Sequence, residues 1–237
     1  MQDPQERVRL AMESVLQWSA ISPHTPLVLC DGSGFDFRPM VAQLPNAHQI
    51  ECLTFQNDSA AVQLHGRGYG EGEIVKYAIE NSEQIRTAGA FAKCTSKLWV
   101  ENFAGCMQQW NGDLLLKGVF SNTFSPLTPT TLAYIDTRFY AANIDIYRKL
   151  FLNAHLAVRS QHGHSLEECF KDIFLTAQLK GCLMAPPPII CGVGGGTGVY
   201  YTNTPLRKQK ERLKYAIAKR DQAFTPWFTT AKRNVLN

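Results

Sequence analysis

The chain has few charged residues, no closely spaced cysteine pair and no long apolar run. Charged side chains make up 19% of its 237 residues, against 45% that are hydrophobic. This composition excludes a disordered chain and is typical of a globular protein whose core needs no cross-links. No stretch approaches the roughly 20 apolar residues that a membrane-spanning helix requires.

The seven cysteines are scattered singly, without a Cys-x-x-Cys pair, and an odd number cannot pair completely within the chain. A reducing compartment is the simpler interpretation. The amino-terminal segment is polar and lacks the apolar run and cleavage site of a signal peptide. We therefore expect a cytoplasmic protein, either soluble or held at the inner face of the cytoplasmic membrane.

Positive charge is concentrated at the carboxyl end. From Pro205 onward nine cations face two acids, a net +7, which leaves −3 for the rest of a chain whose total is +4. The slightly acidic body excludes a nucleic-acid-binding protein of the usual basic kind. The segment 206–237 is expected to be a basic helix and tail after a main domain spanning 1–205. It would either contact an anionic membrane, at about 1 kcal/mol per cation, or lie as a solvated helix along one side.

Apolar spacing predicts alternating helices and strands. Helices are expected over 5–18, 74–82, 145–158, 166–181 and 206–220, with strands at 27–30, 50–55, 98–100, 114–121, 132–142 and in the segment from 185. A glycine-rich turn is expected at 65–73. This order predicts a single α/β domain with a mainly parallel sheet flanked by helices.

Several short sequences then resemble one family in order: LVLCDGSGFDF from residue 27, GRGYGEGE from 66, FAKCTSKLWVEN from 91, DTRF from 136 and LEECF from 166. The first resembles the strand and DGS signature of the inverting GT-A glycosyltransferases of family 2. The whole series is similar to small bacterial proteins encoded with surface-polysaccharide genes. The resemblance implies a GT-A-like (Rossmann-like) fold, a nucleotide-sugar donor, UDP-linked by preference, and a glycan or lipid-linked glycan acceptor.

The acid after the first strand would receive the nucleobase in that family. Asp31 can accept the imide N–H of uracil, while Gly32 and Ser33 allow the backbone to approach the base. The alternative is an ordinary turn in which Asp31 caps backbone amides.

The glycine-rich segment is the expected contact for phosphate or ribose, because backbone amides and a cation converge there ahead of a helix. Arg67, between Gly66 and Gly68, is the expected nucleotide contact, and Glu71 is a candidate for a ribose hydroxyl. The segment is not a P-loop, because the required lysine and hydroxyl residue are missing. A flexible loop without a ligand is the alternative.

The family's metal-binding acid pair would fall where this chain has Glu101 and Asn102. One carboxylate and one amide form a poor cage for Mg²⁺ or Mn²⁺. The sequence therefore leaves metal dependence open, and a metal-independent enzyme is the other possibility.

Two further positions carry candidate catalytic groups. Asp136 and Arg138 share one face of a strand. Arg138 would neutralise the leaving diphosphate, and Asp136 would orient the diphosphate or the sugar. A purely structural Asp–Arg pair is equally compatible with this spacing.

Glu167 and Glu168 begin a helix after Ser165 and are candidates for the base that deprotonates the acceptor, although a capping box uses the same glutamate.

These features together predict a glycosyltransferase that moves a hexose or similar sugar from a nucleoside diphosphate to a bacterial surface glycan, with inversion favoured. Two other classes stay open. One is a different nucleotide-using enzyme, a nucleotidyl- or methyltransferase. The other is a non-catalytic accessory protein of polysaccharide assembly.

Overall fold

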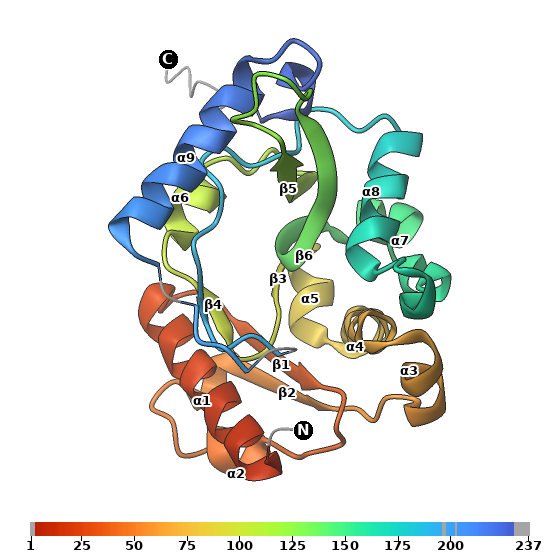
Figure 1. The fold of residues 1–237 in the computed structure, drawn as a ribbon. Helices are drawn as coiled ribbons and strands as arrows, with labels where there is room; N and C mark the ends of the chain where they lie inside the picture. Colours follow the sequence, from red (N-terminus) through yellow and green to blue (C-terminus); the bar gives the residue numbers. More distant parts are fainter. Residues whose placement is uncertain (1–2, 196–197, 202, 230–237) are drawn as a thin grey trace.

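The computed structural model describes residues 3–195, 198–201 and 203–229 and has a mixed α/β fold (Figure 1). Its helices are α1 (Pro4–Ile21), α2 (Arg38–Val41), α3 (Ser59–His65), α4 (Arg67–Asn81), α5 (Glu83–Ala88), α6 (Phe103–Met107), α7 (Ile144–Leu150), α8 (Leu166–Thr176) and α9 (Pro205–Arg220). Its strands are β1 (Leu27–Asp31), β2 (Ile50–Thr54), β3 (Ala90–Cys94), β4 (Leu98–Val100), β5 (Leu114–Ser121), β6 (Thr131–Asn143) and β7 (Ile190–Gly192).

The strands form three small sheets, and this corrects the expected mainly parallel sheet. Only β1 and β2 pair in parallel among these strands, whereas β3–β6–β5 and β4–β7 are antiparallel. Connection length explains the difference. The segment between β1 and β2 is long enough for a crossover, but β5 and β6 are joined by a short hairpin connection, which forces antiparallel pairing.

The glycine-rich segment is the second correction, because it is helical and not a turn. Helix α4 begins at Arg67, directly after Gly66, whose φ of 99° lies in the region that favours glycine. A Cβ on Gly68 would lie 2.9 Å from the Cβ of Leu166, and one on Gly72 would lie 2.2 Å from that of His155. The glycines therefore allow close packing of α4, which offsets their low helix propensity.

Two helices in the carboxyl-terminal half of the chain are shorter than predicted. The helix expected over 145–158 ends as α7 at Leu150 and is followed by a separate turn of 3-10 helix at Ala154–Ala157. Helix α8 starts after Ser165 as expected, and the side chain of Ser165 accepts a hydrogen bond from the amide of Glu168. It ends at Thr176.

The largest core cluster joins the two longest strands to helices on both sides. It includes Leu116 of β5, Ile135 of β6, Ile79 of α4, Phe170 of α8 and Tyr215 of α9. In Figure 1, α9 and α8 lie on opposite sides of the long curved strand β6. The carboxyl-terminal helix thus shares the main core. Residues 230–237, with the cations Lys232 and Arg233, lie outside the described part of the chain.

Helix α1 connects the parallel strand pair to the start of β4. Its Ser14 hydroxyl and Trp18 indole N–H both donate to the carbonyl of Leu98, at 2.7 and 3.0 Å. Another face of α1 packs with β1 and β2 in a small cluster that includes Val15 and Ile50. Within the described residues, no helix combines the length and apolar character needed to cross a bilayer.

Candidate functional site

The turn after β1 holds Asp31 as a cap. Its Oδ1 accepts a hydrogen bond from the amide of Ser33 at 2.9 Å and lies 3.5 Å from Nη2 of Arg7. Ser33 also pairs with Gln56 across an isolated bridge. The turn-capping alternative is therefore realised, and the side chain keeps further acceptor capacity for a ligand.

This turn lies directly against the amino-terminal half of α4. The backbone amide of Asn57 donates to Gly32 O at 3.0 Å, and its side-chain amide donates to Gly70 O and to Glu73 Oε2. A Cβ on Gly32 would lie 1.6 Å from Asn57 Oδ1. The glycine thus accommodates Asn57. The 31–33 turn and the glycine-rich segment therefore lie side by side, with Asn57 as the bridge.

Lys97 lies at the same place, and sequence reasoning missed it. It is only 8% exposed and has a φ of 68°, a left-handed conformation that is uncommon for lysine. Burial lowers the pKa of its ammonium, the positive charges of Arg7 and Arg67 lower it further, and Asp31 acts in the opposite direction. Arg7, Arg67 and Asp31 therefore all lie within electrostatic range of Lys97, and Arg7 contacts Asp31 directly; we call Arg7, Arg67 and Lys97 the cationic cluster.

Arg67 also connects this cluster to the segment that follows β7. Its Nη1 donates to the carbonyl of Gly195 at 3.2 Å, and Val193 N donates to Lys97 O at 3.1 Å. Gly66 and Gly68 help to place the arginine. A Cβ on Gly66 would lie 2.1 Å from Ser160 Oγ, so both glycines allow close approach to the α8 end of the fold.

Glu71 does not face the cluster as a loop carboxylate. It lies in the second turn of α4 and forms an ion pair with Lys93 of β3, whose side chain is 10% exposed. The Lys93 ammonium also donates to Thr95 Oγ1 and Thr137 O, at 2.8 and 2.7 Å. Glu71 therefore joins α4 to the central sheet, which leaves a ribose contact as a prediction without support from its geometry.

Asp136 and Arg138 form a tight pair on β6. Nε of Arg138 donates to Asp136 Oδ1 at 2.8 Å, and Lys117 Nζ lies 3.1 Å from Oδ2. Burial alone would raise the pKa of Asp136, but Lys117 and Arg138 hold it well below its ordinary value. Because Asp136 is 1% exposed, it is placed to position Arg138 and not to contact a substrate itself. This burial favours the structural pair over the expected catalytic role, which stays a prediction. Arg138 is the more accessible partner, and its guanidinium lies 5.2 Å from the ring centroid of Tyr201.

The two acids at the start of α8 differ in their surroundings. Glu168 is ion-paired with Lys171, whose Nζ also donates to Ala133 O at 3.0 Å. The carboxylate of Glu167 is one of the charges that raise the pKa of Tyr134, after burial and Asp136. Glu167 thus lies within electrostatic range of Tyr134 on β6, while Glu168 is engaged by its own salt bridge.

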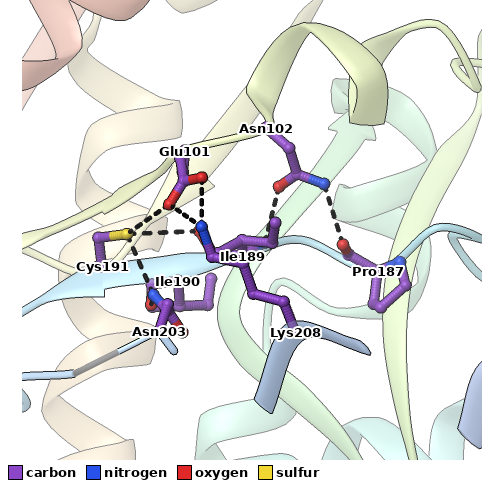
Figure 2. Close-up of polar contacts among 8 residues, drawn as sticks. All are labelled: Glu101, Asn102, Pro187, Ile189, Ile190, Cys191, Asn203 and Lys208. Atoms are coloured by element: carbon purple, nitrogen blue, oxygen red, sulfur yellow. Dashed lines mark hydrogen bonds and ion pairs between the residues drawn. The ribbon is translucent and has the colours of Figure 1, made fainter. Parts of the chain in front are cut away.

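Glu101 and Asn102 both serve the structure (Figure 2). The Glu101 carboxylate accepts hydrogen bonds from Lys208 Nζ at 2.6 and 2.8 Å. The Asn102 amide accepts from Ile189 N at 2.7 Å and donates to Pro187 O at 3.1 Å. Within the described residues, no group of three or more His, Cys, Asp or Glu side chains could hold a metal ion. These residues do not fit a divalent cation.

The cationic cluster is the part of the molecule best suited to bind an anion. Its cations come from α1, α4 and the turn before β4, and it lies at the first turn of the 15-residue α4, where the helix dipole adds positive potential. Only Arg67 had a signal in the sequence, its position among glycines. Arg7 and Lys97 are far apart in the chain and no motif marks them.

No family model matches this chain, and no curated protein and no solved structure matches it either.

Proposed function

We propose that the protein is a GT-A-like glycosyltransferase that binds a nucleoside diphosphate sugar, preferably a UDP-sugar, and transfers the sugar to a glycan or lipid-linked glycan. The observation that carries this proposal is the cationic cluster around Asp31, at the end of a strand and the start of α4. A diphosphate needs two or more cations and backbone amides at short range, and a nucleobase beside it needs an acceptor for its imide N–H.

Sugar transfer needs a leaving-group stabiliser and a base. In the proposed step, the acceptor hydroxyl oxygen bonds to the anomeric carbon while its proton passes to Glu167. The bond from that carbon to the diphosphate oxygen breaks, and the electron pair leaves with the diphosphate. The cationic cluster and Arg138 stabilise this developing charge. Glu167 is the preferred base because Lys171 already pairs with Glu168.

The proposed step does not call on Glu101 and Asn102 as metal ligands, because Glu101 is paired with Lys208 and Asn102 is hydrogen-bonded to Ile189 and Pro187. The stabilising charge comes instead from arginine and lysine. Arginine matches phosphate geometry with two parallel hydrogen bonds, which a lysine cannot make.

Calorimetric titration of the full chain with UDP, GDP and CDP, each without metal, tests the nucleotide site. We expect UDP to bind and Arg7→Ala and Arg67→Ala each to weaken binding by about tenfold or more, since a charge-assisted hydrogen bond contributes roughly 1.5–3 kcal/mol. Arg9→Ala is the matched control for Arg7→Ala, because Arg9 lies on the same helix and pairs with Glu6 and Glu13.

Other results would support the other classes of protein. A thermal shift with S-adenosylmethionine and none with any nucleoside diphosphate would replace sugar transfer with methyl transfer. Product formation with a nucleoside triphosphate and a sugar phosphate would indicate a nucleotidyltransferase. If a variant carrying Asp31→Ala and Arg138→Ala keeps full function in cells, the protein is a non-catalytic accessory factor.

We also propose that the protein contacts an anionic membrane surface, where a lipid-linked acceptor would lie. Exposed apolar side chains are present both on the basic helix α9 and in the β5–β6 loop: Phe124 (46%), Leu127 (92%), Leu206 (76%) and Leu213 (53%). Lys210 Nζ lies 6.0 Å from the Phe124 ring centroid, so the loop and the helix form one surface. We call these four residues the apolar rim. Interleaved cations and apolar groups favour the boundary of an anionic bilayer.

A further inference from the structure

A hollow opens beside the carboxyl end of β4, next to the contacts drawn in Figure 2. It has a volume of about 390 Å³. Its wall combines the rings of Trp99, Tyr200 and Tyr201 with the polar side chains of Glu101 and Asn203. Aromatic rings with a few convergent polar groups are the usual lining of a small-molecule site.

Backbone contacts hold the aromatic side of this hollow in place. Val193 and Tyr200 form an antiparallel bridge, and the amide of Tyr201 donates to Gly192 O at 2.8 Å. The rings of Trp99 and Tyr200 meet edge to face, with centroids 6.4 Å apart. Tyr200 remains 51% exposed, so that part of its ring is open to a ligand.

The polar side of the hollow carries no net charge. Glu101 is neutralised by Lys208, and Asn203 is an uncharged amide that donates to Ile190 O at 2.8 Å. This wall therefore offers little electrostatic stabilisation to a phosphate or a metal ion. A carboxylate has about four acceptor sites, however, so Glu101 can accept hydrogen bonds from hydroxyl groups in addition to those from Lys208.

We propose that this hollow binds an uncharged pyranose. The apolar C–H face of the sugar ring would lie on Tyr200, and its hydroxyls would donate to the Glu101 carboxylate and to the amide oxygen of Asn203, whose N–H groups already donate to Ile190 O and Cys191 Sγ. These are the two kinds of surface that a pyranose presents, and the neutral pair of Glu101 and Lys208 favours it over an anionic ligand.

The position of the hollow fits the proposed function. The role of the bound sugar as a substrate rests on that function. Strand β4 leads from Lys97 to Glu101, about 13 Å at roughly 3.3 Å per residue. Tyr201 joins the hollow to Arg138, whose guanidinium lies 5.2 Å from the Tyr201 ring centroid. The pyranose therefore has two sources, a glycan acceptor or the sugar of the donor.

Saturation-transfer NMR and calorimetry on the full chain test the binding itself. The probes are the methyl glycosides of glucose, galactose and N-acetylglucosamine, without nucleotide, and UDP-glucose against UDP. Tyr200→Ala removes the ring, whereas Tyr200→Phe keeps it. Leu175→Ala removes an exposed apolar side chain (45%) near the end of α8, and far-UV circular dichroism verifies that each variant is folded.

An acceptor site predicts that one of the glycosides binds and that Tyr200→Ala weakens it about tenfold while Tyr200→Phe does not. A donor-sugar site predicts that UDP-glucose binds more tightly than UDP and that Tyr200→Ala removes this advantage. The proposal is overturned if folded Tyr200→Ala changes neither measurement, or if no glycoside binds and UDP-glucose binds no better than UDP. If either of these results is obtained while UDP still binds, the pyranose proposal fails and the nucleotide proposal stands. Failure of the pyranose site is thus distinguishable from failure of the nucleotide site.

Discussion

Arg138 lies on the carboxylate of Asp136, two residues before it on β6, with its Nε 2.8 Å from Oδ1 and its Nη2 on Oδ2. The backbone amide of Arg138 donates to the same Oδ1 at 3.1 Å. Lys117 approaches from β5, so a nearly inaccessible carboxylate holds two cations. Asp136 therefore fixes the position of Arg138, the partly exposed cation that would stabilise the leaving diphosphate in the proposed step.

Asp136→Asn should be strongly destabilising, because it leaves Lys117 buried without its countercharge. Removing one partner of a buried ion pair costs about 3–5 kcal/mol. Asp36→Asn is a closely matched control: Asp36 and Arg38 share the same spacing and the same paired contacts, at 2.8 and 2.9 Å, but both are exposed. It should cost less than about 1 kcal/mol. Urea unfolding at neutral pH measures both, and equal losses would contradict the assigned importance of burial.

The same carboxylate should make stability fall in acid. Its pKa is lower in the folded protein than in the unfolded chain, where an aspartate titrates near about 3.9. The stabilisation is therefore fully present above the unfolded value and is lost as pH falls through the folded one. Between about pH 5 and pH 2.5, the wild type should lose stability faster than Asp136→Asn, so that the difference between them shrinks. A constant difference across that range would show that Asp136 does not titrate in this way.

Gly72→Ala should destabilise the protein although alanine is the better helix former. The added Cβ would lie 2.2 Å from the Cβ and 2.6 Å from the Cγ of His155, a side chain that is 3% exposed. Overpacking of this kind costs about 1–3 kcal/mol. In α6, Gly105→Ala meets nothing within 4 Å and should be neutral or stabilising by up to about 1 kcal/mol. Thermal unfolding of both variants compares them, and a stable Gly72→Ala would refute the close packing of α4.

Local sequence was sufficient to predict the elements whose bounds are determined by short apolar runs and helix caps. Strands β4 and β5 have the expected bounds, and Ser165 caps α8 as expected. It was not enough for residues 66–73, where glycine content favours a turn but packing against Leu166 and His155 stabilises a helix. Lys97 gave no local signal either, because its burial and its neighbours Arg7 and Arg67 depend on the tertiary fold.

Vesicle binding should depend on both parts of the apolar rim. The full chain should co-sediment with vesicles of phosphatidylcholine and phosphatidylglycerol, and much less with phosphatidylcholine alone, because the cations of α9 attract anionic headgroups. Leu127→Ser and Leu213→Ser should each reduce binding several-fold, since each removes a side chain that the bilayer boundary would bury. Leu64→Ser is the control, an exposed leucine (59%) on α3. If Leu64→Ser also lost vesicle binding, or if the wild type bound neutral and anionic vesicles equally well, docking through the apolar rim would be contradicted.

Lys97→Gly should separate stability from ligand binding. Glycine adopts a φ of 68° without the penalty of about 1 kcal/mol or more that a side chain meets there. The variant also removes a buried ammonium whose pKa is lowered by burial and by the charges of Arg7 and Arg67, and its free energy of unfolding in urea verifies that it remains folded. Its affinity for UDP should nevertheless fall about tenfold, because one of three cations is missing from the cluster. The control is Gln178→Gly, at an exposed turn residue that also has a positive φ (50°), which should gain stability and keep full UDP affinity. If Lys97→Gly bound UDP as tightly as the wild type, the strained backbone at this position would have no connection with the phosphate site.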